Sequence, residues 1–470
     1  MSFASGVMPA VWKHSFLDPI LKAGDRSDVR NYRPICSIST IPKVMEKLLV
    51  GALRPAMRQF IVPEQHGFIG GRSTTTSLLT FQEVVLRAFE EGCQVDCVYT
   101  DFAKAFDKVP HQRLLLKLEA FGIFGRLLAW LASYLADRRL TVRLKSACSH
   151  SFMALSGVPQ GSHLGPLLFL IFINDVGSVL PSDVGFLVYA DDIKLFRRVA
   201  GVEDGRALQA GLDRLDRWCV VNGLLLSTPK CCVVSFSRSP SPILFEYSSS
   251  GSALSRKNVV RDLGVLLDSQ LSFVDHIELI VGRAMRALGF LRRTARDFTD
   301  PTALVSLFNA LVRPVLEYAS PVWSPFYAVH SLALERVQNH FLRFVGSRTG
   351  TRWWDVDAGA VRREHGWASL ADRRAYLDSA FFLGLLRGLV DAPSLLQSVN
   401  LHVPGYLTRN PALFWSRFAV TNYQHHAPLP RMARNLNSFL LERGNVDVFS
   451  DPVGRIRGDL KSFFRVKGQY

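Results

Sequence analysis

Two adjacent aspartates between apolar runs constrain this 470-residue chain more than any other feature. They are Asp191 and Asp192, in the segment VGFLVYADDIKLFRR at residues 184–198. Neighbouring side chains of a regular strand point to opposite faces, so both carboxylates can serve one site only at the turn of a β-hairpin. Two such carboxylates repel one another and lose hydration, which raises their pKa values unless a cation binds. The segment alone leaves two interpretations open, a metal site and a solvated Asp-Asp turn.

A second apolar strand also ends at a carboxylate. The segment VDCVYTDF, residues 95–102, predicts a buried strand that ends at Asp101, with Phe102 at a tight turn. Oxygen ligands suit Mg²⁺, which is usually held by a small number of protein carboxylates together with substrate phosphates. Two ions about 3.5–4 Å apart would activate a 3′-hydroxyl and hold a triphosphate. Asp107 competes as a ligand, although capping of the following helix is its simpler role.

A glycine-rich loop and an apolar run complete the pattern. Residues 156–176 read SGVPQGSHLGPLLFLIFINDV and predict a loop followed by a buried helix. Glycines allow the loop backbone to approach a nucleotide closely, and Gln160 offers an amide there. A strand ending in Asp, then this loop and helix, then the Asp-Asp hairpin together indicate nucleotidyl transfer more strongly than any one piece.

Composition and charge favour a folded protein with a polyanionic partner. The chain is 48% hydrophobic, has a formal net charge of +16 and a pI near 9.8. Such a charge suits nucleic acid, while anionic lipid surfaces stay an alternative. The length predicts two or three subdomains. Seven cysteines without a CxxC pair indicate free thiols in a reducing compartment. The longest apolar run, residues 164–173, is far shorter than a membrane span, and we expect an intracellular protein with no membrane partner.

The rest of the chain gives a coarse secondary-structure prediction. We expect helices over residues 76–91, 111–136 and 277–293, a strand over 140–144, and a loop or linker over 235–257. Residues 350–470 show helical patches without recognisable chemistry. In the helix at 277–293, three arginines lie away from the apolar stripe. Because no acidic residue lies between Glu278 and Asp297, a phosphate-facing role is favoured over a solvated arginine face.

Eight blocks, in this order, resemble the reverse transcriptases of non-LTR (LINE-type) retrotransposons, most closely the jockey-like group. They run from about Pro19 to Phe344 and read DPILKAGDRSDVRNYRPI, QHGFIGGRST, YTDFAKAFDKVPH, SGVPQGSHLGP, LVYADDIKLF, WCVVNGLLLSTPK, VRDLGVLLDSQLSFVDHI and LVRPVLEYASPVWSP. The resemblance implies an α+β right-hand polymerase with fingers, a palm of antiparallel sheet plus helices, and a helical thumb. The implied divisions are fingers at 1–75, palm with part of the fingers (the reverse transcriptase core) at 76–276, thumb at 277–350 and a helical C-terminal region of unknown role at 351–470.

The same resemblance implies roles for individual residues. The catalytic and metal-binding groups would be three carboxylates, a main-chain carbonyl and a lysine that protonates the leaving pyrophosphate: Asp101, Asp191, Asp192, Phe102 and Lys230. They would hold two Mg²⁺ ions, with Mn²⁺ as an alternative. The incoming nucleotide would meet Lys22, Arg33, Phe106, Gln160 and Gly161. The nucleic acid would meet a primer-gripping turn and the thumb arginines, which are Leu263, Gly264, Arg283, Arg286 and Arg293.

Simpler interpretations stay open for several of these residues. Lys22 and Arg33 could be exposed charges, Lys230 a solvated loop lysine, and Phe106 a core side chain. In the sharper interpretation, Phe106 lies beneath the sugar of the incoming nucleotide and excludes a 2′-hydroxyl. The chain also departs from the family at His163, where an apolar residue is usual.

The expected function is RNA-directed DNA synthesis, in which dNTPs extend a DNA primer or nicked target DNA on an RNA template. We expect action in the nucleus after a cytoplasmic ribonucleoprotein stage. Two alternatives are an inactive nucleic-acid-binding relic of a transposon and an RNA-dependent RNA polymerase, which would need a small residue in place of Phe106. Because Met1 falls just before the fingers and no cysteine follows Cys232, we expect neither an upstream endonuclease nor a Cys-type zinc knuckle.

Overall fold

The computed structural model describes residues 2–22, 24–298, 300–402, 412–415 and 418–467. They form two compact units, each assembled from segments that lie far apart in the sequence. The first unit comprises residues 1–69, 94–235 and 241–257. The second comprises residues 70–93, 236–240 and 258–470.

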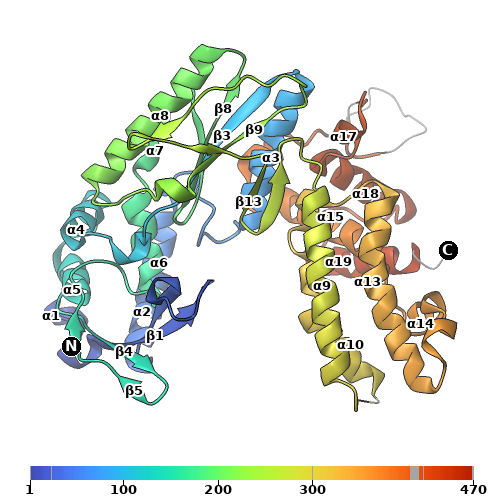
Figure 1. The fold of residues 1–470 in the computed structure, drawn as a ribbon, viewed down its shortest axis with the longest axis horizontal. Coiled ribbons are helices and arrows are strands. Elements are labelled where there is room, and N and C mark those ends of the chain that lie inside the picture. Colours follow the sequence, from blue (N-terminus) through green and yellow to red (C-terminus); the bar gives the residue numbers. More distant parts are fainter. Residues whose placement is uncertain (1, 23, 299, 403–411, 416–417, 468–470) are drawn as a thin grey trace. The chain divides into compact units, whose positions relative to one another are not determined.

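A five-stranded sheet organises the first unit (Figure 1). β3 is antiparallel to β8, and β8 forms a hairpin with β7. Six of the seven residues of β3 are buried, so both faces of this strand are covered, and its polar residues Gln94, Asp96 and Thr100 are buried as well. In spatial order the strands are β12 (Ser255–Arg256), β9 (Cys232–Phe236), β3 (Gln94–Thr100), β8 (Asp192–Val199) and β7 (Gly185–Tyr189).

Helices supply the rest of this core. The predicted buried helix is α6 (Leu164–Ile173), with nine of ten residues buried, as a helix that is apolar all round requires. α8 (Val202–Val221) packs on β8. The predicted helix over 111–136 divides into α4 (His111–Ala120) and α5 (Gly125–Leu135), because Gly122 and Gly125 adopt positive φ angles of 84° and 61°.

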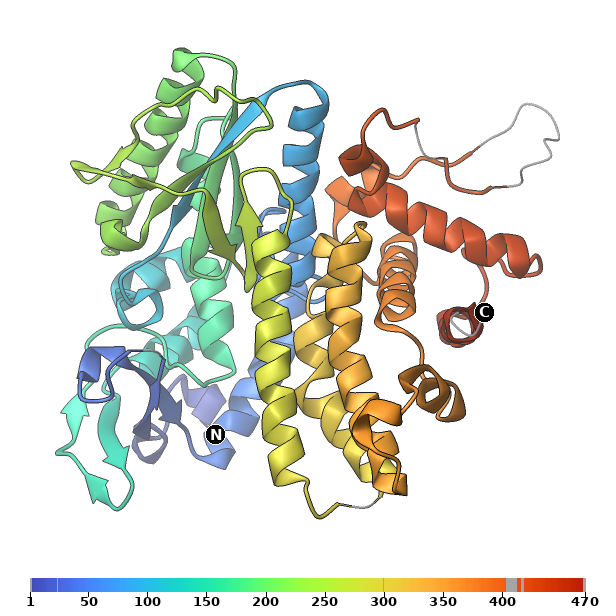
Figure 2. The same ribbon diagram turned by 45° about the vertical axis from the view of Figure 1, so that its right-hand side comes forward.

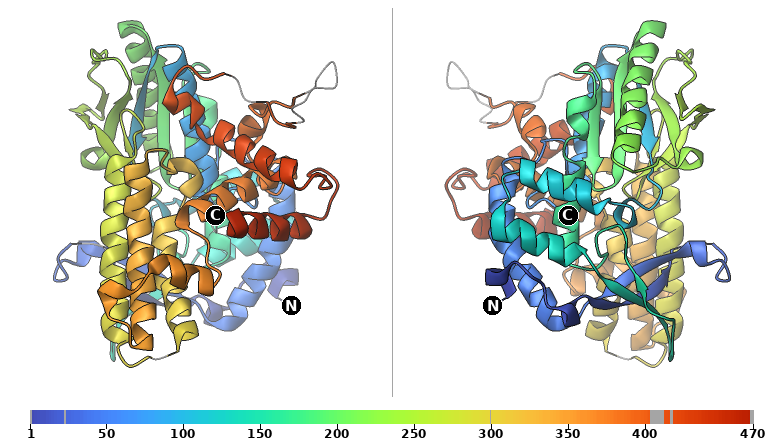
Figure 3. Two further views of the ribbon diagram at one scale, coloured as in Figure 1. Left: turned by 90° about the vertical axis from the view of Figure 1, so that its right-hand side faces the viewer. Right: turned by 90° about the vertical axis from the view of Figure 1, so that its left-hand side faces the viewer.

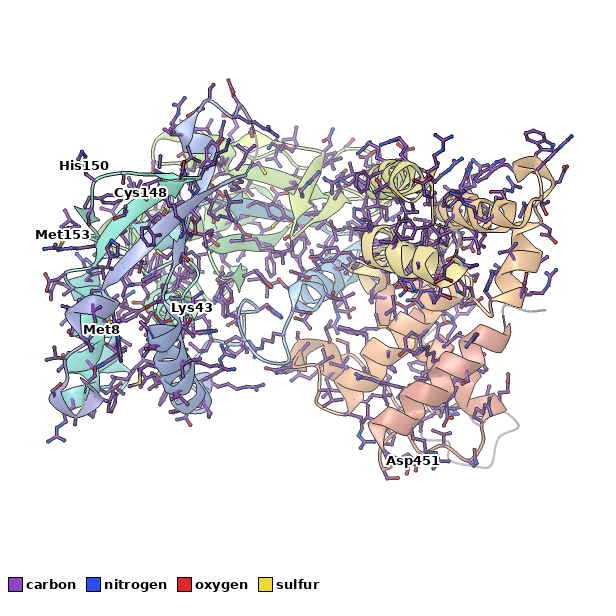
Figure 4. The ribbon with its side chains drawn as sticks, turned by 90° about the horizontal axis from the view of Figure 1, so that it is seen from below. Met8, Lys43, Cys148, His150, Met153 and Asp451 are labelled. Atoms are coloured by element: carbon purple, nitrogen blue, oxygen red, sulfur yellow. The ribbon has the colours of Figure 1, made fainter. Side chains whose placement is uncertain are left out.

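A second sheet of the first unit is built on β1, which is antiparallel to β2 and parallel to β4. It is seen in the right-hand view of Figure 3, and Figure 4 labels Cys148 and Met153 on its outer strands. The predicted strand over 140–144 is confirmed as β4. The strands and the accompanying helices are β1 (His14–Leu21), β2 (Tyr32–Ser37), β4 (Arg139–Leu144), β5 (Ala147–Cys148), β6 (Phe152–Met153), α1 (Ser2–Ser5), α2 (Thr40–Arg58) and α7 (Val176–Val179).

The segment over residues 235–257 was predicted as a loop or linker rather than packed structure, and this prediction is wrong for residues 235–236, which end β9, and for residues 241–257. Tyr247 is 2% exposed and donates a hydrogen bond of 2.8 Å to the carboxylate of Asp96, which lies inside β3. The main chain of Ile243 bonds the side chain of Gln94. The serine-rich composition concealed these anchors, since a few buried side chains suffice to pack an irregular segment.

The second unit is mostly helical, with α9 and α13 packed side by side (Figure 2). The predicted helices over 76–91 and 277–293 are confirmed as α3 and α9. The elements are α3 (Thr74–Glu90), β13 (Val259–Asp262), β14 (Val265–Asp268), α9 (Val274–Thr294), α10 (Pro301–Leu311), α11 (Arg313–Glu317), α12 (Ser320–Trp323), α13 (Ala328–Gly346), α14 (Ala358–Glu364), α15 (Leu370–Leu386), α16 (Pro393–Gln397), α17 (Asn422–His425), α18 (Pro428–Glu442) and α19 (Val453–Lys467).

The α+β class is confirmed, with an antiparallel sheet flanked by helices and a separate helical region. The boundaries of fingers, palm and thumb stay a prediction, because the two units follow packing rather than function. α3, predicted to belong to the palm, packs on α12 and α16 in the second unit. Helices from residues 351–470 pack on α13 within that unit. Among the described residues, no helix is both long and apolar enough to cross a membrane.

Candidate active site

One cavity of about 1340 Å³ in the first unit collects most of the predicted site residues. Its walls come from β1, β2, the turn after β3, the glycine-rich loop and the β7–β8 turn. Nine of the ten residues predicted for catalysis or nucleotide binding line it: Lys22, Arg33, Asp101, Phe102, Phe106, Gln160, Gly161, Asp191 and Lys230. The tenth, Asp192, is exposed and is not part of the lining.

The turn after β3 places Asp101 in the cavity. Its main-chain carbonyl accepts a hydrogen bond of 2.7 Å from the amide of Ser227, and the amide of Ala103 donates to the carbonyl of Leu225. Lys230 Nζ donates to Asp101 Oδ2 over 2.9 Å. The Lys230 side chain is 61% exposed and forms this ion pair at the edge of the cavity. Its ammonium group thus pairs with Asp101, the carboxylate that is predicted to bind metal.

The β7–β8 turn presents Asp191 to the same space. Burial raises the pKa of Asp191, and the negative charge of Asp101 raises it further, while the cationic Arg33 and Lys22 lower it. All four side chains belong to residues that line the same cavity. Asp192 begins β8, pairs with Tyr189 and is exposed beside this turn. The structure thus brings Asp101 and Asp191 together and leaves Asp192 outside the cavity lining.

Gln65 and Gly67 hold this turn in place, and neither was predicted as a site residue. Gln65 is 2% exposed, and its Oε1 accepts hydrogen bonds from the amides of Gly67 (2.8 Å) and Ala190 (3.0 Å). A Cβ on Gly67 would lie 2.5 Å from the Ala190 nitrogen, so only glycine permits this approach. Ala190 itself has φ of 58°, a strained value for a non-glycine residue. The QHGF block contains both Gln65 and Gly67, but Ala190, which Gln65 bonds, lies 125 residues away in the sequence.

The glycine-rich loop is fixed by Gln160 and Gly161. Gln160 Nε2 donates to Asp107 Oδ1 over 2.8 Å, and its carbonyl accepts a 2.7 Å hydrogen bond from the amide of Cys36. Gly161 has φ of 103°, and a Cβ there would meet the Cys36 carbonyl at 2.8 Å. The capping role favoured for Asp107 is wrong, because Pro110 is the N-cap of α4 and no side chain caps it. Burial raises the pKa of Asp107, and its function in the fold is to orient Gln160.

Glu46 anchors the other end of this loop and was also missed. It lies on α2, is fully buried, and its Oε2 accepts hydrogen bonds from the amides of His163 (2.7 Å) and Leu164 (3.4 Å). A carboxylate at these amides complements the N-terminus of α6, although burial raises its pKa. The His163 side chain is exposed, so the departure from the family pattern leaves this anchor intact.

Phe106 is both a packed residue and a cavity residue. Its ring stacks on Phe169 at a centroid distance of 4.2 Å and an interplanar angle of 18°. The edge of Phe68 approaches it at 6.4 Å. Phe106 and Phe68 both line the cavity. The core and gate interpretations are therefore compatible, since one face of the ring packs on α6 and the side chain still reaches the cavity.

The donor set is that of a hard divalent cation. Asp101 and Asp191 offer carboxylate oxygens, and Mg²⁺ needs only one or two protein carboxylates when phosphates supply further ligands. The described residues hold no preassembled group of three His, Cys, Asp or Glu side chains suited to a metal. Lys230 pairs with Asp101, and burial raises the pKa of Asp191, so a cation bound here would stabilise the charged form of both carboxylates. The residues fit such an ion.

In the second unit, Leu263 and Gly264 form the turn between β13 and β14, with positive φ angles of 43° and 91°. Tyr318 fixes this turn and was not predicted. Its hydroxyl donates to the Leu263 carbonyl over 2.8 Å and lies 3.0 Å from the hydroxyl of Thr74, at the start of α3. The LVRPVLEYASPVWSP block contained Tyr318, but nothing in the sequence indicated its contact.

The predicted thumb arginines lie on α9. Arg283, Arg286 and Arg293 are exposed, and no ion pair among the described residues involves them. Arg286 and Arg293 pass close to Gly282 and Gly289 one turn earlier. Their contact with phosphate stays a prediction.

Comparison with known proteins agrees with this geometry. The family model for "Reverse transcriptase (RNA-dependent DNA polymerase)" matches residues 20–267, more than half of the chain. The chain belongs to the reverse transcriptase family. The carboxylates predicted to be catalytic, the glycine-rich loop and the β13–β14 turn all lie within the matched range. Reverse transcriptases generally use divalent metal ions, in accord with the paired carboxylates of the cavity.

Curated relatives specify the kind of reverse transcriptase. The chain is 28% identical over 356 residues to the "Probable RNA-directed DNA polymerase from transposon BS" of Drosophila melanogaster, covering 72% of this chain and 38% of that protein. It is 29% identical to the X-element polymerase of the same organism (74% and 38% covered) and 27% identical to the jockey polymerase of Drosophila funebris (74% and 39% covered). The resemblance to non-LTR, jockey-like reverse transcriptases is confirmed. The chain spans less than two fifths of the length of these relatives.

Among solved structures, the chain is similar to the apo telomerase of Candida Tropicalis. The TM-score is 0.43 at 11% identity, covering 82% of this chain and 63% of the telomerase.

Proposed function

We propose that this reverse transcriptase extends a DNA 3′-end with dNTPs on an RNA template. The observation that carries the proposal is the convergence of Asp101, Asp191, Lys22, Arg33 and the Gln160 loop on one cavity. Carboxylates beside cationic side chains are the groups needed to hold metal ions and a triphosphate together. The names of the relatives, which are RNA-directed DNA polymerases, support the same activity.

Each group then has a role in the proposed reaction. Asp101 and Asp191 would hold two Mg²⁺ ions, with Asp192 and the carbonyl of Phe102 as further ligands, and Mn²⁺ as an alternative ion. When bound, the ions would polarise the attacking 3′-hydroxyl and neutralise the triphosphate. Lys22 and Arg33 would pair with phosphate oxygens. Their electrostatic interaction with Asp191 would then be replaced by one with the substrate.

Lys230 would deliver a proton to the departing pyrophosphate. Its ammonium group bonds Asp101 at 2.9 Å, so it already lies at the carboxylate that binds metal in this scheme. General acid catalysis needs a donor within hydrogen-bond reach of the leaving oxygen. Binding of a cation by Asp101 would weaken the attraction between the carboxylate and Lys230, which frees the lysine for this role.

The proposed partners follow from the reaction. They are an RNA template, a DNA primer or nicked target DNA, and dNTPs. The net charge of +16 supports a polyanionic partner, and extension of target DNA would take place in the nucleus after a ribonucleoprotein stage in the cytoplasm. Neither alternative is favoured. An inactive relic has no reason to keep the Gln65–Gly67 support of the Asp191 turn, and an RNA polymerase would not place Phe106 in the cavity.

Primer extension tests the proposal. Purified chain with oligo(dT) on poly(rA), dTTP and Mg²⁺ should extend the primer, and chelation of the metal should stop it. Asp101→Asn and Asp191→Asn should each lower the rate by more than about a hundredfold, because even outer-shell changes at metal sites cost about 10–100-fold. Asp213→Asn is a matched control, since Asp213 is an exposed carboxylate on α8 outside the cavity lining. Extension by Asp191→Asn at the rate of the control would refute the assignment.

A further inference from the structure

Four arginines surround the C-terminal ends of α9 and α13 without acidic partners. They are Arg292, Arg296, Arg348 and Arg352, of which Arg348 is half-buried and the other three are exposed. No ion pair in the described part of the chain involves them, although other arginines of the same unit are paired, such as Arg373 with Glu317 and Arg431 with Asp378. These paired arginines are neutralised by a carboxylate, whereas no ion pair among the described residues neutralises the group of four.

Aromatic rings orient two of these guanidinium groups. Arg292 lies 4.4 Å from the ring centroid of Trp353 and 5.7 Å from that of Phe344. Arg348 lies 4.5 Å from the ring of Phe344 and donates to the carbonyl of Ala295. A guanidinium group that stacks on a ring is held in one plane, and its N–H groups remain available at the edge for a bidentate contact with phosphate.

Trp354 stands beside this group with 72% of its surface exposed. Tryptophan is usually well buried, as Trp130 and Trp323 are at 1% in this protein. Trp354 lies in the short 3₁₀ turn Trp353–Asp355, whose first residue is held by Arg292. We name Trp354 with Arg292, Arg296, Arg348 and Arg352 the tryptophan–arginine surface.

We propose that the tryptophan–arginine surface binds single-stranded nucleic acid. A base would stack on the indole of Trp354, and Arg292, Arg296 and Arg352 would contact the flanking phosphates. Stacking platforms with cationic neighbours are the usual means of binding single strands. A duplex fits less well, because its base faces are already covered by neighbouring base pairs. None of these residues lines the active-site cavity, so the surface is a second nucleic-acid site, and its binding does not depend on polymerisation.

Binding without dNTPs tests the proposal on the full chain. Fluorescence anisotropy would compare labelled 20-nucleotide single-stranded RNA, single-stranded DNA and an RNA–DNA hybrid. Trp354→Ala should weaken single-strand binding by about tenfold, since one stacked base contributes about 1–3 kcal/mol. Trp415→Ala is the matched control, because Trp415 is also exposed, at 47%, and belongs to the same unit. The hybrid should lose less than twofold, and the RNA and DNA arms show which strand the surface prefers.

Other outcomes would overturn the proposal. These are an equal loss of single-strand affinity in Trp415→Ala, an equal loss of hybrid affinity in Trp354→Ala, or no loss of single-strand affinity in Trp354→Ala. Trp354→Phe should retain most of the affinity if the ring stacks, and an unchanged melting temperature shows that the fold is intact. The double variant of Arg292→Ala and Arg352→Ala should lower the slope of log K against log salt by about 0.7 per lost contact. Because the assay contains no dNTP, its outcome does not depend on the proposed polymerase activity, so a failure of either proposal can be told from a failure of the other.

Discussion

Replacement of Phe106 by alanine should change which sugar the enzyme accepts. The ring lies in the cavity with its other side stacked on Phe169 at 4.2 Å. If it lies beneath the sugar of the incoming nucleotide, a 2′-hydroxyl collides with it, and removal of the ring opens that space. We expect discrimination between dTTP and rUTP to fall at least tenfold, which corresponds to about 1.4 kcal/mol. The efficiency with dTTP should fall by a smaller factor.

The stability cost can be worked from the burial of the ring. Full burial of phenylalanine makes its replacement by alanine cost about 3–5 kcal/mol. Phe106 is only partly buried and keeps one stacked neighbour, so about 2 kcal/mol is expected. A domain with about 5–15 kcal/mol of stability would remain folded, and the variant should therefore be measurable at 25 °C.

Single-nucleotide insertion kinetics with both sugars, beside thermal unfolding, provides the assay. Phe172→Ala is the control, since Phe172 is fully buried on α6 and does not line the cavity. It should cost more stability, about 3–5 kcal/mol, with the sugar preference unchanged. A folded Phe106→Ala variant with wild-type discrimination would show that the ring serves the core alone.

Three further predictions concern the second unit. The three predicted phosphate-facing arginines are Arg283, Arg286 and Arg293. Their joint replacement by alanine should weaken primer–template binding at every sequence and flatten the slope of log K against log salt by up to about 0.9 per lost contact. An unchanged slope would show that they form a solvated face. Burial lowers the pKa of His276 from 6.5 to about 4. Between pH 6.5 and pH 4 the unfolded chain therefore binds a proton that the folded chain does not. The free energy of unfolding should fall by up to about 3 kcal/mol as the pH drops over this range. Chemical unfolding across that range should show this loss and should not show it in His276→Leu. Tyr318→Phe removes the hydroxyl that holds the Leu263 carbonyl and should lower primer extension several-fold at nearly constant melting temperature, whereas Tyr327→Phe, another exposed tyrosine, should not.

Local features of this protein were predictable from the sequence. The strand that ends at Asp101 and the hairpin that carries Asp191 follow from apolar runs of strand length that each end at a carboxylate. The buried helix after the glycine-rich loop follows from ten nearly uninterrupted apolar residues. Each of these signals lies within about twenty residues, where backbone geometry alone relates side-chain spacing to a face of an element. The order of such segments was also enough to indicate the family.

Tertiary structure decided which groups support and neutralise the site. Lys230 bonds Asp101 from 129 residues away, Gln65 holds the Asp191 turn across 125 residues, and Glu46 anchors the glycine-rich loop across 117 residues. It also showed that Asp107 orients a glutamine rather than capping a helix. Periodicity carries no record of such contacts, because a hydrogen bond between distant segments depends on how whole elements pack. The sequence therefore determined the chemical groups at the active site, and packing determined their partners.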